Sequence, residues 1–409
     1  MKKSKRFRRT VLLLLIAALL ALSACTSRDR VPELAPAAAP NHAATMTPAA
    51  TPASAPTPMP TPEPDYPALG PVTVDGTLLA SGSVDIEEIA YVSAAEYLDA
   101  LGVEVTEKGD TLSFTWRKSE ISMTVGRSDL LRAGAPQKLD GKVLRYHGQV
   151  WLPVRSVNTA LVISSFDDEE NNHLYCTPGA GDWALAEGYT VPVVMYHGVD
   201  DYYHDNEELY CLRKDIIDQF QYYTDNGFDC IWFEDLEHIE DYDKPIILTF
   251  DDGMTNNYTN LLPLLKQFNI KATFFVITDA YEKWGDMYMT DEMIKEVSES
   301  GLVSVQSHSH GHAEMHTLSI KAQTSELEQS KMRITRITGK EPFVFCYPRG
   351  SWNINTLELM PDYFRFGVDM GGKVYVTGSN PLKITRFYVK RYYTSKNVDE
   401  MFKRAGLYQ

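Results

Sequence analysis

The sequence predicts an α/β fold over residues 190–409, a distorted and incompletely closed (β/α) barrel that follows a small α+β repeat module. The barrel is predicted because short apolar runs alternate with helical stretches from about Thr190 onward. There are about seven such repeats, fewer than the eight that close a barrel. The module is predicted because residues 71–178 contain an internal repeat with an offset of 60 residues.

Each apolar run of the barrel reads as a buried strand, and each stretch with apolar residues three and four apart reads as a helix. Three helical stretches are followed directly by a glycine that marks the helix end: Gly227, Gly301 and Gly339. The expected strands cover residues 191–197, 228–233, 246–252, 272–277, 302–307, 343–346, 366–369 and 384–389. The expected helices cover residues 215–226, 257–268, 290–300, 319–338 and 398–405.

The repeat aligns residues 91–94 (Tyr-Val-Ser-Ala) with residues 151–154 (Trp-Leu-Pro-Val). Each unit reads as an apolar entry, an amphipathic helix, a strand, a polar turn and a second strand. In the first unit the strands are expected at residues 103–105 and 111–116.

The second unit contains the phrase Val-Trp-Leu-Pro-Val-Arg-Ser-Val at residues 150–157. It resembles the copper amine oxidase N-terminal-like module of secreted bacterial proteins. No copper-ligand cluster accompanies the phrase, because His147 and His173 are the only histidines of residues 71–180. We interpret the module as a spacer or wall-contact domain, with an aromatic-lined sugar site as the alternative.

Residues 1–25 read as an export signal, with a basic head, an apolar run from Val11 to Leu20 and small residues at the exit. The apolar run is short for a membrane-spanning helix. Cys25 follows Leu-Ser-Ala, which resembles a bacterial lipobox, and this resemblance implies that Cys25 is lipidated and becomes the mature amino terminus. An ordinary signal peptide and an uncleaved anchor are the alternatives.

Residues 26–70 read as an extended stalk, since 11 of the chain's 22 prolines lie between Pro32 and Pro67 among Ala and Thr. Cleavage before Cys25 would remove six basic residues and change the net charge from −16 to about −22. Such an acidic chain argues against nucleic acid as a partner and fits a soluble body tethered near a membrane. The pairing or free state of the other four cysteines stays open: Cys176, Cys211, Cys230 and Cys346.

Two adjacent acids, Asp251 and Asp252, follow the apolar run at 246–250 and precede Gly253. The carboxyl end of a strand is where α/β barrels place their chemistry. Burying two neighbouring carboxylates without a cation would be costly. The alternative is a strand-ending turn with solvated acids.

Histidines gather after the strand expected at 302–307, in the phrase Gln-Ser-His-Ser-His-Gly-His. His308 and His312 are four residues apart, so one helical turn would aim both imidazoles at one point. Two imidazoles and a carboxylate make a site for a divalent transition metal. His310 and His316 leave the choice of ligands open, and pH sensing is another use of such a cluster.

Together these phrases resemble the polysaccharide deacetylases of the NodB-homology type (carbohydrate esterase family 4), over roughly residues 190–395. The family phrases are Thr-Phe-Asp-Asp-Gly at 249–253, His-Ser-x-x-His at 308–312 and an aromatic–proline–Gly turn within 345–350. The resemblance implies a metal, most simply zinc, with cobalt, manganese and nickel as alternatives. It implies the following roles: Asp252, His308 and His312 as metal ligands, Asp251 as general base, and a backbone N–H of the turn Tyr347, Pro348, Arg349 and Gly350 as the oxyanion donor.

The chain departs from this family pattern in three places. Arg349 stands where the family usually carries tyrosine, and no histidine follows His316 to supply the family's late acid. In the poly-N-acetylglucosamine deacetylase branch an early Met-Tyr-His phrase supplies that acid, which makes His197 the candidate here, with a core histidine as the alternative. Arg386 matches a late arginine of that branch and is the candidate to brace Asp251, because Cys346 cannot.

The sequence thus predicts an exported, lipid-anchored and monomeric enzyme at the outer face of a bacterial cell membrane. Its expected activity is removal of N-acetyl groups from an N-acetylglucosamine-containing polysaccharide of the cell wall or the extracellular matrix. Two alternatives remain: a catalytically impaired wall-binding protein on the same fold, and an esterase acting on O-acetylated xylan.

Overall fold

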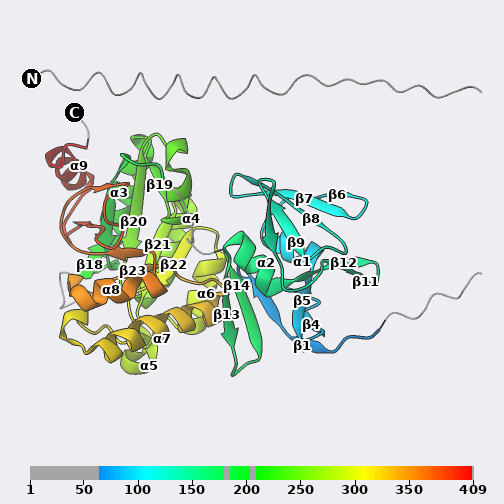
Figure 1. Ribbon diagram of the computed structural model, residues 1–409. Helices are drawn as coiled ribbons and strands as arrows, with labels where there is room; N and C mark the ends of the chain where they lie inside the picture. The colour runs from blue at the N-terminus through cyan, green and yellow to red at the C-terminus, as the bar shows by residue number, and fades with distance from the viewer. Residues whose placement is uncertain (1–63, 179–184, 203–208, 408–409) are drawn as a thin grey trace, which may run out of the picture. The chain divides into compact units, whose positions relative to one another are not determined.

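The computed structural model describes residues 64–178, 185–202 and 209–407 (Figure 1). The expected export signal with Cys25 and most of the expected stalk lie outside these residues, so both stay predictions. Within the described ranges, no helix is long and apolar enough to cross a membrane.

Residues 66–177 form an α+β unit, called here the repeat module, from three small sheets and two short helices. The strand orders are β1-β4-β5-β12-β11, β10-β9-β8-β7-β6 and β13-β14-β2-β3. The helices are α1 (Ala94–Ala100) and α2 (Val154–Leu161). The strands are β1 (Ala68–Gly70), β2 (Val72–Val74), β3 (Thr77–Leu78), β4 (Ser83–Ile86), β5 (Ile89–Ser93), β6 (Thr106–Lys108), β7 (Thr111–Trp116), β8 (Ser119–Thr124), β9 (Asp129–Arg132), β10 (Ala135–Lys138), β11 (Leu144–Tyr146), β12 (Gln149–Pro153), β13 (Ser164–Asp168) and β14 (His173–Thr177).

The internal repeat corresponds to a strand–helix step that occurs twice, since β5 leads into α1 and β12 leads into α2. The two entry strands pair with each other, and the helices bury Leu98 and Leu161 in one core. The strand expected at residues 103–105 does not form. The Val103 N–H instead donates to the Leu98 carbonyl (3.2 Å) and closes α1, so pairing starts only at β6.

Residues 187–407, called here the barrel domain, are built on a curled sheet of parallel strands. The order is β24-β23-β22-β21-β20-β16-β26, with β19 pairing along the first half of β20. Val368, at the end of β24, makes one isolated bridge to Ile384, so the sheet curls without a continuous closing ladder. The strands are β15 (Thr190–Val191), β16 (Val193–Tyr196), β17 (Gly198–Asp200), β18 (Tyr210–Leu212), β19 (Asp229–Ile231), β20 (Pro245–Phe250), β21 (Ala272–Val276), β22 (Val303–Ser307), β23 (Val344–Cys346), β24 (Phe366–Val368), β25 (Tyr375–Val376) and β26 (Phe387–Tyr388).

Helices cover the outside of the curled sheet, where α6 and α7 contact β22 (Figure 1). Along β20, Leu248 and Phe250 join the core under the helices, whereas Ile247 joins the core inside the curl. Side chains alternate along a strand, so Thr249 and Asp251 share the inner side with Ile247. The helices are α3 (Arg213–Asp225), α4 (Leu262–Phe268), α5 (Ala280–Trp284), α6 (Asp291–Glu299), α7 (Ile320–Thr338), α8 (Ile354–Tyr363) and α9 (Ser395–Arg404).

The predicted α/β class and the incompletely closed barrel are confirmed. Two helices were not predicted, α5 and α8, and the second contains Pro361. The strand expected at 384–389 is reduced to β26, because the chain there makes only the Ile384 bridge before it pairs with β16. The helix expected at 257–268 begins with the π-helical turn η3 (Asn257–Leu261).

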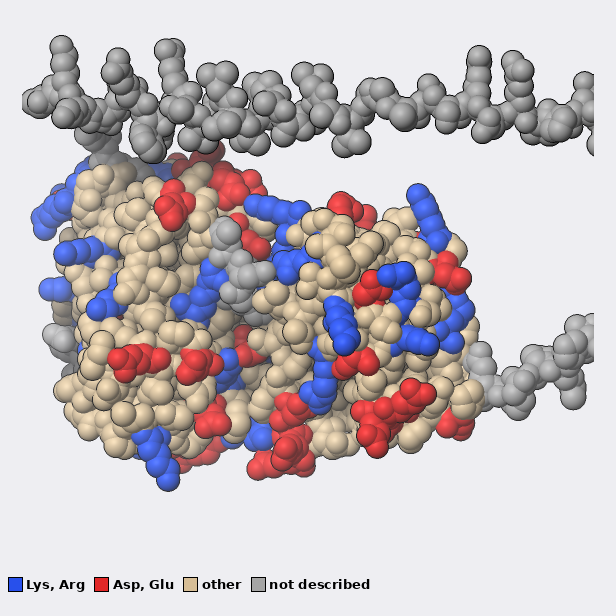
Figure 2. All heavy atoms as spheres, viewed as in Figure 1, with Lys and Arg blue, Asp and Glu red and all other residues tan. Residues whose placement is uncertain are grey.

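The face of the protein in Figure 2 carries basic and acidic side chains interspersed, without a continuous basic surface among the described residues. The fields of opposite charges interspersed in this way partly cancel, and dissolved ions screen what remains at physiological salt. The charge on this face is therefore a mixture, although the chain as a whole is acidic.

Candidate active site

The two adjacent acids lie where β20 ends, and the backbone there turns sharply. The Asp251 N–H still donates to the Tyr196 carbonyl of β16 (2.9 Å), whereas Asp252 takes a left-handed φ of 76°. Gly253 is also left-handed (φ 75°), and a Cβ there would lie 3.1 Å from the Val276 side chain. Non-glycine residues such as Asp252 rarely adopt this left-handed conformation, and backbone strain of this kind is typical of functional sites. The turn thus sends the two carboxylates in different directions.

Asp252 meets two histidines from the loop that follows β22. Its Oδ1 lies 3.4 Å from His308 Nε2 and 3.8 Å from His312 Nε2. One donor atom from each of the three residues lies within 4.8 Å of the other two. His308 Nδ1 donates to the Cys346 carbonyl (2.9 Å), so Nε2 is the nitrogen that faces Asp252. Burial, and next the neighbouring His308, lowers the pKa of His312 to about 4, so its imidazole is neutral at pH 7.

These residues fit a divalent transition metal on the chemistry of their donors. Burial lowers the pKa of His308, but Cys346 and the hydrogen bond to Asp252 raise it well above its usual range, so a bound cation would have to displace the proton from Nε2. Two imidazoles and one carboxylate on one face of a site then leave further coordination positions open. The hydrogen bond from His308 Nδ1 to the Cys346 carbonyl fixes the ring orientation that such a ligand needs.

The helical turn expected to align the two histidines is not there. Residues 308–312 form a loop in which Ser309 and His312 are left-handed (φ 66° and 59°). Ser309 holds this loop in place, because its Oγ accepts the His312 N–H (2.9 Å). The other two histidines are bonded elsewhere: His310 Nδ1 lies 2.9 Å from Thr278 Oγ1, and His316 Nδ1 lies 2.6 Å from Ser351 Oγ.

Asp251 is held by Arg386 rather than by the histidines. The guanidinium donates from Nη1 to Oδ1 (2.7 Å) and from Nη2 to Oδ2 (2.8 Å), and both side chains are buried. Burial alone would raise the pKa of Asp251, but the Arg386 charge and hydrogen bonds hold it well below its usual range. Asp251 is therefore a carboxylate at neutral pH, fixed at both oxygens.

Arg386 is itself fixed by three further groups of the sheet. It donates to Thr249 Oγ1 (2.9 Å) and to the Asp369 carbonyl (3.3 Å), and it contacts Cys346 Sγ (3.1 Å). The Cys346 thiol in turn lies 3.6 Å from Asp251 Oδ2. The small cysteine thus leaves room for a guanidinium that arrives from the last strand of the sheet.

His197 directly follows β16 and faces the same end of the sheet. Its charge, when present, lowers the pKa of both Asp251 and Asp252, so the ring lies within electrostatic range of the two carboxylates. Its Nδ1 is buried and has no hydrogen-bond partner among the residues that the structure describes.

The turn at 347–350 is the short helix η6 (Pro348–Gly350), in which Arg349 is left-handed (φ 56°). The Tyr347 N–H donates to the Val368 carbonyl (3.0 Å), and the Gly350 N–H donates to the Tyr347 carbonyl (2.9 Å). Pro348 has no N–H. The Arg349 side chain points outward, since it is 70% exposed and pairs with Glu314 (3.2 Å).

Two tyrosines near the site were missed by the sequence reasoning, Tyr210 and Tyr288. Burial raises the pKa of both phenols, to about 12 for Tyr288, and the Asp252 carboxylate raises it further. Met254 brings Tyr288 to the site through an isolated bridge. No motif marks either tyrosine, so only the fold could place them.

The polysaccharide deacetylase family model matches residues 238–363, the stretch that carries both aspartates, both histidines and the turn. This stretch of the chain is therefore similar to polysaccharide deacetylases. Of the residues that form the site described above, His197 and Arg386 lie outside the matched stretch.

Several curated proteins are similar to this stretch at moderate identity. YxkH of Bacillus subtilis (strain 168) is 28% identical over 173 residues, 41% of this chain and 60% of YxkH. The poly-β-1,6-N-acetyl-D-glucosamine N-deacetylase of Staphylococcus aureus (strain MRSA252) is 27% identical over 161 residues, 36% of this chain and 54% of that protein. The chain thus spans only part of the length of these relatives.

Among solved structures, BA0330 from Bacillus anthracis aligns with 73% of this chain and 99% of its own, with a TM-score of 0.50 and 20% identity. This likeness concerns the fold alone.

Proposed function

We propose that this protein is a metal-dependent hydrolase that removes N-acetyl groups from an N-acetylglucosamine-containing polysaccharide. The observation that carries the proposal is the different surroundings of two adjacent acids, in a stretch that matches the deacetylase family. Asp252 faces His308 and His312, whereas Asp251 is held as a carboxylate by Arg386. A ligand and a base side by side are what amide hydrolysis at a metal requires.

The metal ligands in this proposal are Asp252, His308 and His312. A divalent ion bound by them, most simply zinc, with cobalt, manganese and nickel as alternatives, supplies a Lewis acid for the acetamide carbonyl. The three residues are the protein's contribution to this step. Asp252 Oδ1 already lies 3.4 Å from His308 Nε2 and 3.8 Å from His312 Nε2, close enough for one ion to contact all three atoms.

Asp251 is the proposed general base. It accepts a proton from the attacking water as the oxygen of that water bonds to the acetyl carbon. Arg386 keeps Asp251 ionised and fixes both oxygens, so the carboxylate is ready and oriented. The same pair explains how two adjacent acids can be buried together.

Arg349 is proposed to donate its backbone N–H to the oxyanion that develops on the acetyl oxygen. The amides of Tyr347 and Gly350 are already bonded within the fold, and Pro348 has none, so Arg349 supplies the amide of this turn. A preorganised amide donor of this kind is worth about 3 kcal/mol in a transition state. Because the donor is the backbone, the change from tyrosine to arginine at this position leaves it in place.

His197 is the proposed general acid. When the carbon–nitrogen bond breaks, the amine leaves with the electron pair and takes a proton from His197, so the products are acetate and an amino sugar. His197 suits the role because it faces both carboxylates and its Nδ1 has no partner among the described residues.

We further propose that the chain is lipid-anchored at Cys25 on the outer face of the cell membrane and works as a monomer on a wall or extracellular polymer. The sequence of residues 1–25 and the poly-N-acetylglucosamine deacetylase among the relatives support this placement and this substrate class.

Acetate release from peptidoglycan, chitin oligomers, poly-N-acetylglucosamine and acetylated xylan tests the proposal. We expect release from an N-acetylglucosamine polymer and a return of activity when zinc is added after chelation. Release from acetylated xylan alone would make the protein an esterase. Binding without any release would make it the impaired wall-binding protein.

His312→Ala tests the ligand set. We expect zinc affinity to fall at least 100-fold, because two ligands cannot replace three. His316→Ala is the matched control and should keep its zinc, measured by competition with a chromogenic chelator. Equal occupancy in both variants would contradict the assignment of His312.

A further inference from the structure

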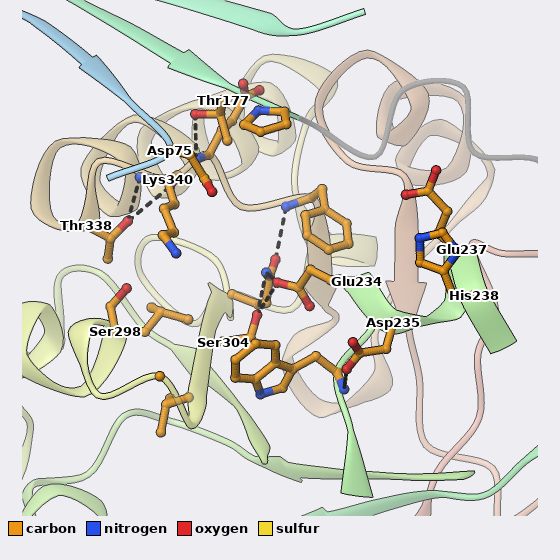
Figure 3. A pocket seen from close by; sticks show the side chains of 18 of the residues that line it. Asp75, Thr177, Glu234, Asp235, Glu237, His238, Ser298, Ser304, Thr338 and Lys340 are labelled. Atoms are coloured by element: carbon orange, nitrogen blue, oxygen red, sulfur yellow. Dashed lines mark hydrogen bonds between the residues drawn. The ribbon is translucent and has the colours of Figure 1, made fainter. Parts of the chain in front are cut away.

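A second hollow lies away from the site of Asp252, beside the short helix η2 (Glu234–Asp241) and the first half of β22 (Figure 3). Its volume is about 530 Å³. Figure 3 shows Glu234 and Ser304 on one wall, with Lys340 and Thr338 across from them. Asp75 and Thr177 of the repeat module also line it. The hollow is large enough for a ligand of about two sugar rings, by the usual size of small-molecule sites.

Glu234 is the central polar group of this hollow. Its Oε1 accepts from Ser304 Oγ (2.6 Å) and from Gln306 Nε2 (3.5 Å). Its Oε2 is buried and has no hydrogen-bond partner among the residues that the structure describes. A buried carboxyl oxygen without a partner costs about 1–3 kcal/mol, so a ligand that donates to it gains that interaction.

The groups around Glu234 are fixed by the sheet. Gln306 Oε1 accepts the backbone N–H groups of Phe343 (3.0 Å) and Val344 (2.9 Å), so its amide can present only Nε2 toward Ser304 and Glu234. Because these atoms lie on strands and not on a free loop, the hollow is preorganised. Such rigidity is typical of binding sites rather than of surface irregularities.

Aromatic side chains complete the lining: Trp116, Trp232 and Phe343. Trp116 belongs to the buried core of the repeat module, and Lys271 Nζ lies 4.5 Å from the centre of the Trp232 ring. Phe343 and the other face of Trp232 are therefore the apolar surfaces that remain for a ligand. Apolar faces beside both an acceptor and a donor match a sugar, whose ring has C–H faces and whose hydroxyl groups donate and accept. An anionic ligand is disfavoured by the acidic groups of the lining: Asp75, Glu234, Asp235, Glu237 and Glu341.

We propose that this hollow is a second saccharide-binding site, which holds a segment of the polymer apart from the bond that is hydrolysed. The identity of the sugar, an N-acetylglucosamine oligomer, rests on the proposed function. The hydroxyl groups of the sugar donate to Glu234 Oε2 and accept from Lys340, and its rings pack on Trp232 and Phe343.

The two sites lie at opposite ends of one strand. Ser304, Gln306 and His308, which directly follows β22, are two residues apart and so point to the same side of the strand, with Ser304 against Glu234 and His308 against Asp252. Four residues of strand separate them by about 13 Å. A disaccharide therefore cannot occupy both, whereas a long polymer has segments for each.

The proposal is tested by titrating N-acetylglucosamine tetramer into the full chain carrying Asp251→Asn, with calorimetry as the readout. We expect two binding events per chain. Adding Glu234→Gln keeps the shape of the side chain but places an N–H₂ where Oε2 accepts. This change should lower the affinity of one binding event at least tenfold and leave the affinity of the other unchanged. Trp232→Phe is the second variant, and it should weaken the same event.

The matched control is Glu358→Gln, an exposed carboxyl on α8, which should leave both events unchanged. Thermal melting of each variant checks that it is folded. A single binding event, or two events that neither Glu234→Gln nor Trp232→Phe alters, would overturn the proposal. Acetate release by the native chain is measured separately, so a failure of the proposed function shows there and leaves the binding result independent.

Discussion

Asp251 and Glu234 are two buried carboxyl groups of the same curled sheet, and their surroundings give them opposite properties. Asp251, at the carboxyl end, receives two hydrogen bonds from the Arg386 guanidinium, and its pKa is held well below the usual range. Glu234, at the other end, receives hydrogen bonds from Ser304 and Gln306, and burial raises its pKa to about 7.

The difference teaches that the nearest formal charge, and not burial, decides which buried carboxyl stays ionised. Around Asp251, contact with the guanidinium lowers the pKa by more than burial raises it. Around Glu234, hydrogen bonds from a hydroxyl and an amide do not offset the rise in pKa that burial causes. The first group suits proton abstraction at neutral pH, and the second suits hydrogen bonding to a neutral ligand.

Replacing Arg386 by methionine should have the largest effect, because it removes the charge that distinguishes the surroundings of Asp251 from those of Glu234. Asp251 would then be a buried carboxylate without its cation, and losing one partner of a buried pair costs about 3–5 kcal/mol of unfolding free energy. Urea denaturation measures this loss. The double variant Asp251→Asn with Arg386→Met should recover part of it, because neither member of the pair is then charged. A single variant as stable as the native chain would contradict the role given to the pair.

Replacing His197 by alanine should remove the proposed proton donor near Asp251 and leave the Asp251–Arg386 pair in place. We expect turnover to fall about 100-fold, within the usual range for a general acid, with little change in zinc content. Acetate release and metal analysis on the same sample measure both. His147→Ala, an exposed histidine of the repeat module, is the control, and near-native turnover of His197→Ala would remove His197 from the mechanism.

The smallest expected effect is on the pH dependence of stability, through Glu234. Its pKa is about 7 when folded, against 4.5 as the ordinary value. The folded chain therefore binds more protons than the unfolded chain between these pH values, so this group's contribution to stability is lost as pH rises through that window. Glutamine does not titrate, so the unfolding free energy of Glu234→Gln should rise by about 2–3 kcal/mol relative to that of the native chain between pH 5 and pH 8.

The measurement is urea denaturation of both proteins at the two pH values. Glu358→Gln, which replaces an exposed carboxyl, should show no such gain. A difference between native and Glu234→Gln chains that is the same at pH 5 and pH 8 would mean that the pKa of Glu234 is not raised.

The sequence predicted the strand ends well, because a short apolar run followed by polar residues is typical of a buried strand that ends at the edge of a sheet. The runs before Asp251 and before His308 became β20 and β22, whose carboxyl ends lie at the same edge of the sheet. The helical turn inferred for His308 and His312 was wrong, because spacing alone does not distinguish a helix from a loop with two left-handed residues. The late arginine, Arg386, could be proposed only through the family resemblance.

Nothing in the sequence pointed to Glu234 or to the hollow around it. Glu234 is one of several acids after an apolar run, and only the fold shows that Ser304 and Gln306 meet it. Contacts between segments about 70 residues apart leave no periodic pattern, so a site built from them cannot be found from one sequence. The same holds for Tyr210 and Tyr288 near Asp252.

The central claim is that Asp252 holds a metal while Asp251 abstracts a proton. Asp251→Asn tests it most directly, with zinc content and acetate release from an N-acetylglucosamine polymer measured on the same preparation. We predict native zinc content with acetate release reduced about 1,000-fold or more, the loss of a positioned general base. Native-like acetate release by Asp251→Asn would contradict the account.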